Sequence, residues 1–227
     1  MKLHLLNSVI VYFSIIYIIS NSKLLSLFLS IIFTLLLSRQ KTIPLLLSYY
    51  LTISWIEWFA HKYYMHDVPE TNKEHIRHHL SVLPNMNLIK KDEFGDNDFS
   101  WSMIFKITFL AFMLSFYYFY KIYNIKPRVH YMNLLGGAIL VTMIWNNVHN
   151  AMHCEDLTTT IFNGPPSIIS KDTARSLPGF DTLYKHHYLH HIVKKPKGNF
   201  NIVFLGMDKL MGTEVDEKHK IYFNKCY

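Results

Sequence analysis

The chain is divided into long apolar runs and polar stretches, and nearly all of the apolar runs lie before residue 149. A helix needs about 20 mostly apolar residues to cross the hydrocarbon of a bilayer. Five runs approach that length and are expected to be helical, namely residues 5–20, 24–38, 43–60, 101–123 and 129–148. The pattern therefore predicts an all-α fold, an integral membrane bundle of about four to five spanning helices.

The same pattern divides the chain into three regions. Residues 1–42 hold the first two runs, which are joined only by residues 21–23, and we expect them to form a membrane hairpin. Both runs are short, so one of these two helices need not cross the membrane fully. Residues 43–213 hold the other three runs and form the main domain, and residues 214–227 form a C-terminal tail.

Composition favours a membrane over nucleic acid as the partner of this chain. The formal net charge is +7 and the isoelectric point is near 9.2. Such a charge is also typical of nucleic-acid-binding proteins. However, basic residues beside apolar spans are attracted to acidic lipid headgroups. The chain has no zinc finger, RNA-binding signature or basic repeat, and we expect no nucleic acid as a partner.

Ten of the fourteen histidines lie in four short clusters. The clusters are His61 and His66; His75, His78 and His79; His149 and His153; and His187, His190 and His191. Neutral imidazole is the commonest metal ligand in proteins. Three clusters have the i, i+3 or i+4 spacing that places side chains on one face of a helix. Ten imidazoles are about the number that two adjacent metal ions can use.

The first cluster does not have a helical spacing. His61 and His66 are five residues apart, so they cannot both point inward from a regular α-helix. Pro69 follows shortly afterwards, and proline disfavours helix at the residue before it. We therefore expect His66 to lie at or just beyond the end of the third apolar helix.

The order of spans places all four clusters on one side of the membrane. Residues 43–60 lead into the first cluster, residues 101–123 leave that side, and residues 129–148 return to the third cluster. On this topology, 17 of the 23 lysines and arginines lie on the histidine side and 6 on the other. The excess of positive charge places the histidine clusters in the cytosol.

The ligand type and its position narrow the kind of metal site. Nitrogen ligands argue against calcium and magnesium and suit zinc, copper or iron. Structural zinc would need only four ligands and would normally include cysteine. A metal transporter would place its ligands inside the spans. The clusters instead lie beyond the span ends, which predicts a metal centre at the membrane surface that faces a lipid.

Carboxylates beside the clusters are candidates for orienting the imidazoles. They are Asp67, Glu74, Glu155, Asp156 and Asp181.

With these motifs the chain resembles the fatty acid hydroxylase/sterol desaturase superfamily of membrane di-iron enzymes. The likeness lies in the order of the four histidine motifs, in the two spans between them and in the ending NFNIVFLGMDKLMGT, and it covers roughly residues 50–213. Within that ending, Asp208, Gly212 and Thr213 match the pattern that closes many members. The run EWFAHKYYMH and the later FGDNDF are also similar to the β-carotene hydroxylases of the same wider group.

The resemblance implies two iron ions, for which zinc can substitute in purified protein, and O2 as co-substrate. It implies hydroxylation or desaturation of a membrane lipid, of acyl or sterol type, in lipid biosynthesis, with the endoplasmic reticulum as the membrane in a eukaryotic host. By position, ten histidines carry over as metal ligands: His61, His66, His75, His78, His79, His149, His153, His187, His190 and His191. His186 is adjacent to the fourth motif and could exchange roles with His187.

The resemblance also implies an electron donor on a separate protein, because the chain has no haem-binding His-Pro-Gly-Gly segment. The donor would be cytochrome b5-like or ferredoxin-like. Lys194, Lys195 and Lys197 could dock an acidic carrier by complementary charge or could contact lipid headgroups.

Two alternatives stay open at the level of sequence. A carotenoid ring hydroxylase shares the same motifs and differs in substrate. A non-catalytic membrane protein that binds or transports metal belongs to a different class. The sequence names neither the lipid nor the position that is oxidised.

Overall fold

The computed structural model describes residues 3–89, 101–155, 169–193 and 197–215. The helices are α1 (Leu3–Ser20), α2 (Lys23–Leu36), α3 (Thr42–Phe59), α4 (Pro69–Ser81), α5 (Trp101–Tyr123), α6 (Pro127–Met152), α7 (Lys171–Ser176), α8 (Phe180–Ile192) and α9 (Met207–Met211), and a π-helix, η1 (Ala60–Asp67), continues α3. Within those ranges there is no strand, only an isolated bridge between Val82 and Leu88. The predicted all-α class is confirmed.

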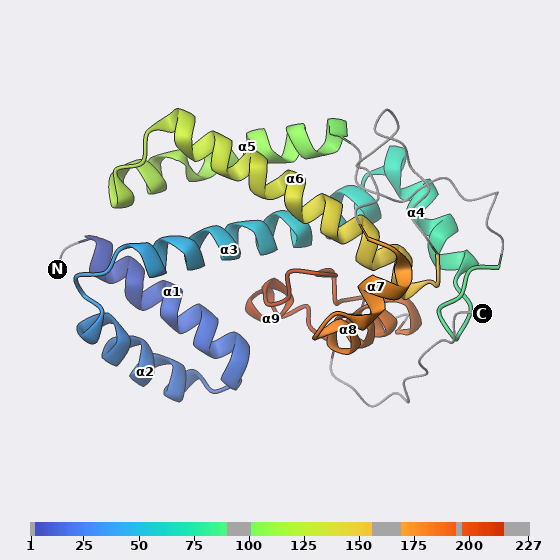
Figure 1. Cartoon of the computed structure of the whole chain (residues 1–227), viewed down its shortest axis with the longest axis horizontal. Helices are drawn as coiled ribbons and strands as arrows, with labels where there is room; N and C mark the ends of the chain where they lie inside the picture. Colours follow the sequence, from blue (N-terminus) through green and yellow to red (C-terminus); the bar gives the residue numbers. More distant parts are fainter. Residues whose placement is uncertain (1–2, 90–100, 156–168, 194–196, 216–227) are drawn as a thin grey trace.

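Helices α3, α5 and α6 lie along one another and connect the two ends of the molecule (Figure 1). α3 runs toward the end that carries η1 and α4, α5 starts near that end and runs back, and α6 returns to it. α7 and α8 lie at the same end. All four histidine clusters therefore gather at one end of the helices, as the order of apolar runs predicts.

Where α2 packs on α1, small polar side chains are buried and large apolar ones are exposed, the reverse of the arrangement in a water-soluble protein. The side chains that α2 buries are small and polar: Ser26 and Ser30 are 0% exposed, whereas Leu35 and Leu36 are 71% and 74% exposed. The Ser26 hydroxyl donates to the Ser22 carbonyl, which satisfies it within its own helix. Small residues at helix contacts and apolar side chains outside are typical of helices that pack in lipid.

Two helices are long and apolar enough to cross a membrane by length and composition, Leu3–Ser20 and Ser102–Tyr123. α2 is apolar but has only 14 residues. At 1.5 Å per residue it extends about 21 Å, less than the roughly 30 Å hydrocarbon core. The expected bundle of four to five spans is therefore not confirmed by these criteria.

Candidate metal centre

The structure brings all ten predicted ligands together in two adjacent groups. The first histidine group contains His61, His66, His75, His79 and His190, and the second histidine group contains His78, His149, His153, His187 and His191. Within each group the possible ligand nitrogens all lie within 4.8 Å of one another. The groups adjoin each other, because the ring centroids of His79 and His191 are 4.3 Å apart. Each group has the composition and compactness to hold a metal ion.

The histidines of α4 and of α8 are each divided between the two groups. On α4, His75 and His79 are four residues apart and join the first group, whereas His78 joins the second. α8 reverses this arrangement: its two histidines four residues apart join the second group, and His190 joins the first. The i+3 member of each helix points to the neighbouring group, so α4 and α8 each contribute to both groups.

The π-helix η1 explains how His61 and His66 contribute to the same group. The backbone N–H of Val68 donates to the carbonyl of Tyr63, five residues earlier, at 3.0 Å. This wider turn brings residues five apart near one face. The two imidazole rings are accordingly stacked, with centroids 5.2 Å apart. The helix ends in the π form at Asp67, one residue beyond His66, so the expectation that it ends near His66 is confirmed.

The first group contains nitrogen contacts that hydrogen bonds alone do not explain. Nε2 of His75 lies 3.1 Å from Nε2 of each of His61, His66 and His79. A single imidazole N–H cannot donate to three acceptors at once. A cation among these nitrogens would satisfy their lone pairs.

The distances also match metal coordination. The nitrogens of His66, His75, His79 and His190 form a closed ring with sides of 3.1, 3.1, 3.1 and 3.3 Å. The centre of a square with such sides is about 2.2 Å from each corner, close to the roughly 2.0–2.1 Å of a metal–imidazole bond. Five nitrogens exceed the four of tetrahedral structural zinc. The first group thus fits a metal ion of higher coordination number.

The second group is also short of hydrogen-bond partners. His187 Nε2 lies 3.1 Å from His153 Nε2 and 3.0 Å from His191 Nε2. Both ring nitrogens of His149 and Nε2 of His78 are buried without a hydrogen-bond partner. Buried polar groups are normally paired, so unpaired nitrogens aimed at one another indicate room for a cation.

Backbone carbonyls, not carboxylates, orient three of the ligands. Nδ1 of His61, His153 and His190 donates to the carbonyls of Phe200, Met86 and Gly198 respectively, each at 2.7 Å. Because Nδ1 carries the proton, the lone pair of Nε2 faces the histidine group. Metal-bound histidines in other proteins are commonly oriented by a hydrogen bond of this kind.

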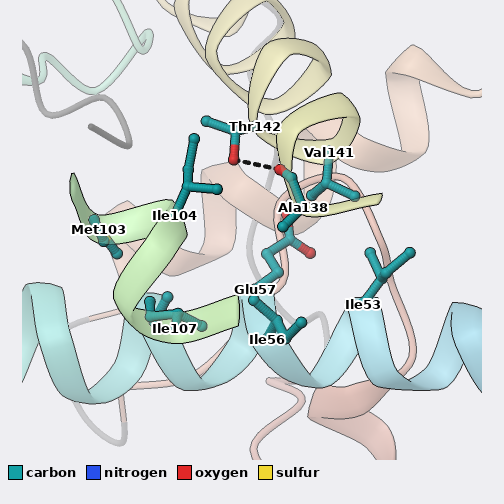
Figure 2. Close-up of a pocket in the computed structure, with 10 residues that line it drawn as sticks. Ile53, Ile56, Glu57, Met103, Ile104, Ile107, Ala138, Val141 and Thr142 are labelled. Carbon is teal, nitrogen blue, oxygen red and sulfur yellow. Dashed lines mark hydrogen bonds between the residues drawn. The ribbon is translucent and has the colours of Figure 1, made fainter. Parts of the chain in front are cut away.

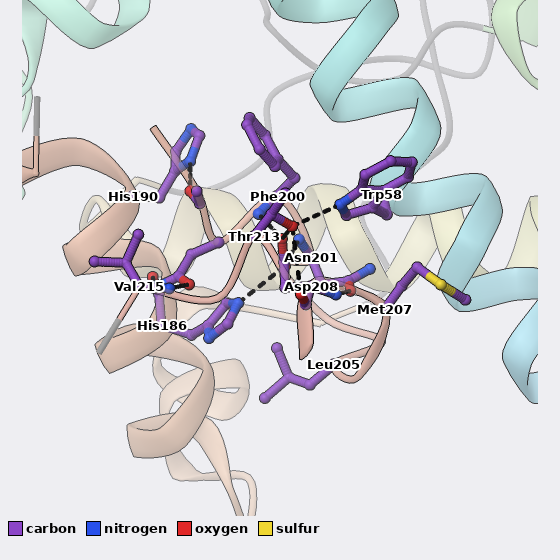
Figure 3. Close-up of polar contacts among 12 residues, drawn as sticks. Trp58, His186, His190, Phe200, Asn201, Leu205, Met207, Asp208, Thr213 and Val215 are labelled. Atoms are coloured by element: carbon purple, nitrogen blue, oxygen red, sulfur yellow. Dashed lines mark hydrogen bonds and ion pairs between the residues drawn. The ribbon is translucent and has the colours of Figure 1, made fainter. Parts of the chain in front are cut away.

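The loop that supplies two of these carbonyls is held by Asp208, which is 1% exposed (Figure 3). Its carboxylate accepts the backbone N–H groups of Phe200 at 2.9 Å and Asn201 at 2.6 Å. It also accepts the Thr213 hydroxyl at 2.6 Å and lies 3.2 Å from Nε2 of His186. Asp208 therefore fixes the segment on which the orientation of His61 and His190 depends.

Glu57 holds the following part of the same segment against α3. Its carboxylate accepts the backbone N–H groups of Val203 at 2.8 Å and Phe204 at 2.9 Å and the side-chain amide of Asn201 at 3.0 Å. Since Glu57 lies one turn before His61, it fixes the C-terminal segment at the level of the first histidine group. The sequence analysis assigns no role to Glu57. The feature that could have indicated one is the presence of a carboxylate within the apolar run of residues 43–60.

Burial keeps the imidazoles neutral. Desolvation, followed by repulsion from neighbouring imidazoles, lowers the pKa of His61, His75, His78, His79, His187 and His191 well below its ordinary value. The pKa of His153 is lowered by burial to about 4. Burial also lowers the pKa of His190 to about 4, against the opposing hydrogen bond to Gly198. The lone pairs are therefore available for a metal at neutral pH.

Acid is expected to destabilise the metal-free protein. The pKa of His153 is about 4 in the folded chain against an ordinary 6.5, so between these values only the unfolded chain takes up the proton. The contribution of each such histidine to the free energy of unfolding is constant above pH 6.5 and falls as the pH drops toward 4, by up to about 1.4 kcal/mol per pH unit. The check is the thermal midpoint of metal-free protein in detergent between pH 7 and pH 5.

His153→Asn is the matched variant for this measurement, because an asparagine amide can also donate to the Met86 carbonyl. It should reduce the dependence on pH by the contribution of one histidine. A midpoint that does not change between pH 7 and pH 5 would contradict the expected neutral, buried imidazoles.

The remaining histidines lie apart from both groups or outside the described residues. His186 pairs with Asp208, so it does not exchange roles with His187. His130 is hydrogen-bonded to Tyr49 at 3.1 Å and Ser115 at 2.9 Å near the opposite end of α6. His4 is on α1, and His219 lies outside the described residues.

The carboxylates proposed from sequence as orienting groups have different positions from those expected. Asp67 and Asp181 are exposed, and Glu155 is half-buried. Asp156 and the side chain of Glu74 lie outside the described residues, as does the FGDNDF run. The observed orienting groups are carbonyls because the C-terminal segment and the loop after α4 return over the imidazole rings.

The fold and site define an all-helical protein with two adjacent, mostly buried groups of histidines, each of which could hold a metal ion. No family model matches the chain, and no curated protein or solved structure is significantly similar to it.

Proposed function

We propose that this protein is an integral membrane di-iron oxygenase that hydroxylates or desaturates a C–H bond of a lipid, with O2 as co-substrate and electrons from a separate donor. The observation that carries the proposal is the pair of adjacent five-histidine groups at the end of the apolar helices. An enzyme that oxidises a bilayer lipid needs a redox metal site where the hydrocarbon begins.

The ligand set favours iron over structural zinc. Imidazole suits iron, copper and zinc alike, but five nitrogens around one centre favour a metal that accepts more than four ligands. When bound, iron and dioxygen supply the oxidising power for an unactivated C–H bond, which no side chain possesses.

The chain itself contributes binding, orientation and exclusion of water. The ten imidazoles would hold the metals in the neutral form that burial imposes. Carbonyls of the 198–200 segment and of Met86 direct three of the rings. Trp145 is 0% exposed and stacks on His149 with centroids 4.4 Å apart, which covers the second group with an apolar surface.

The membrane placement rests on the apolar exterior and on charge. Exposed apolar side chains on α1, α2 and α5 need a hydrocarbon environment. A multi-pass arrangement with the histidine end in the cytosol agrees with the distribution of lysine and arginine. In a eukaryotic host the endoplasmic reticulum is the expected membrane.

The electron donor is expected to be acidic and to approach the first histidine group. Lys197 lies close to this group, because the carbonyl of the next residue, Gly198, accepts from Nδ1 of His190 at 2.7 Å. Its side chain is exposed, whereas Lys194 and Lys195 lie outside the described residues. A cytochrome b5-like or ferredoxin-like carrier has the complementary charge.

Lipid profiling with isotopic oxygen tests the function. Cells that express the full chain under ¹⁸O2 are expected to accumulate a lipid with one ¹⁸O atom or a lipid with two fewer hydrogens. His78→Ala should abolish that product, because His78 belongs to the second group, and His4→Ala on α1 is the matched histidine control. The purified wild-type protein should contain about two iron ions, one for each five-nitrogen group.

A product that survives His78→Ala unchanged would exclude the proposed centre. Tight metal binding with no change in any lipid would indicate the non-catalytic metal-binding class instead.

A further inference from the structure

Two cavities lie against different faces of α3. The cavity between α3, α5 and α6 has a free volume of about 20 Å³ (Figure 2), roughly the space that one water molecule requires. The other lies between α1, α3 and α5 and has a free volume of about 320 Å³, and we call it the α1 cavity. Ligand pockets in proteins usually measure about 300–1,000 Å³. The α1 cavity therefore has the size of a ligand site.

The α1 cavity opens toward the outside of the helix bundle. Ile10 and Leu114 line it and are 55% and 66% exposed. These residues belong to α1 and α5, the two helices that are long and apolar enough to cross a membrane. With the proposed membrane placement, the opening faces hydrocarbon. A ligand therefore enters the α1 cavity from the bilayer.

The lining of the α1 cavity is uncharged. It is mostly apolar, and none of the described residues that form it is an acid, a lysine or an arginine. The hydroxyls of Ser48, Thr52 and Ser115 donate to the carbonyls of Pro44, Ser48 and Ala111 in their own helices. A phosphate or ammonium group would lose its hydration here without gaining a partner of opposite charge. The lining thus favours an uncharged ligand.

A buried amide with an unpaired oxygen lies beside this cavity. Asn7 is 2% exposed, and its amide N–H donates to the hydroxyl of Tyr123. That hydroxyl lies 3.0 Å from Oγ of Ser48, which lines the cavity. Val11, one turn after Asn7 on the same face of α1, also lines it. Oδ1 of Asn7 is buried without a hydrogen-bond partner.

A hydroxyl group on the ligand would complete the hydrogen bonds of this amide. Buried polar atoms are normally paired, so the unpaired Oδ1 of Asn7 indicates a missing donor. A hydroxyl both donates and accepts, and it can therefore pair with either end of an amide, whereas an ether oxygen only accepts. The hydroxyl of Tyr12, the residue after Val11, is also buried without a partner. The unpaired groups therefore favour a ligand with a hydroxyl.

We propose that the α1 cavity binds an uncharged lipid that carries a hydroxyl group, and that Asn7 recognises this hydroxyl. The apolar part of the lipid lies against Leu51 and Leu114. Ser48 lies about 20 Å before His61 along the helix axis, so this end of the cavity is remote from the candidate metal centre. The inference goes beyond the proposed function and uses only its membrane placement.

Photolabelling of the full-length protein in phosphatidylcholine vesicles tests the proposal without metal or turnover. The probe is 1-hexadecanol with a diazirine midway along its chain, and labelled residues are identified by mass spectrometry. Labels are expected on the faces of α1, α3 and α5 that line the α1 cavity. Unlabelled 1-hexadecanol should compete about tenfold better than its methyl ether, which has no donor for Asn7. Competition by 1,2-dioleoylglycerol would assign the site to two-chain lipids as well, and its failure to compete would assign the site to one-chain lipids.

Two variants test the head and the body of the site separately. Asn7→Leu removes the amide at similar size and should abolish the preference for the alcohol over the ether. Ser14→Ala is its control on α1, because the Ser14 hydroxyl donates to the Ile10 carbonyl within the helix. Ala111→Phe fills the cavity and should reduce labelling at least about tenfold. Met113→Phe, at a position that is 59% exposed, should label as the wild type does.

Equal competition by the alcohol and the ether in the wild type would overturn the proposal, as would an unchanged preference in Asn7→Leu. Equal labelling of Ala111→Phe and Met113→Phe would also overturn it. Asn7→Leu should keep the iron content and the lipid product of the wild type, because Asn7 contacts neither histidine group. The hydroxyl-lipid site and the oxygenase can therefore fail independently of each other.

Discussion

His187→Ala is expected to empty the second histidine group of metal and to abolish lipid oxidation. His187 is 0% exposed, and its Nε2 lies within 3.1 Å of the nitrogens of both His153 and His191. Loss of a residue that only orients a ligand already costs roughly 10- to 100-fold in metal affinity, and removing the ligand itself should cost more. Iron content should fall from about two ions per chain toward one.

His186→Ala provides a control at the adjacent position. The His186 side chain is 11% exposed and faces Asp208 instead of either group. Asp208 keeps three other donors when His186 is removed. The variant should therefore retain both metals and its product. Loss of metal in His186→Ala with retention in His187→Ala would show that the assignment along α8 is wrong.

The contrast between these neighbours shows what the sequence could predict. Three clusters have spacings of three and four residues, and this periodicity alone places their side chains on inward faces of helices. The order of apolar runs likewise brings α4, α8 and the end of α6 to one end of the molecule. The ten candidate ligands followed from these two patterns, although their role as ligands stays a prediction.

The division of the ten histidines into two groups could not be read from spacing. His75, His78 and His79 share one helical face, and His78 joins the second group through its neighbours on α6 and α8. His61 and His66 are five residues apart and reach the same group because they lie on a π-helix. This form is rare, and helix propensities do not predict it. The placement of His78 depends on long-range contacts, such as that with His149, whose ring centroid is 5.0 Å away.

The orienting groups were missed for a related reason. Sequence proximity favoured carboxylates such as Asp67 and Asp181, which the structure leaves exposed. The groups that fix the rings are main-chain carbonyls, which every residue has and which no motif marks. In the sequence Asp208 is one residue of the NFNIVFLGMDKLMGT ending, and only the structure shows that its carboxylate holds the 198–200 segment.

Asp208→Asn is expected to weaken metal binding selectively at the first histidine group and to lower stability. An amide cannot accept as the carboxylate does from Phe200, Asn201 and Thr213, because its NH2 faces one of these donors. Leaving a buried donor without an acceptor costs about 1–3 kcal/mol. For a chain of this size that corresponds to a fall in the thermal midpoint of roughly 5 °C.

The selectivity separates positioning from a general loss of structure. The 198–200 segment orients His61 and His190, both in the first group, whereas the second group depends on Met86 at His153. Titration of metal-free protein with Fe²⁺ should show one equivalent weakened roughly 10- to 100-fold and the other unchanged. Asp181→Asn, an exposed carboxylate on α8, should leave both equivalents and the midpoint as in the wild type. Equal weakening of both equivalents in Asp208→Asn would mean that Asp208 stabilises the fold without positioning the ligands.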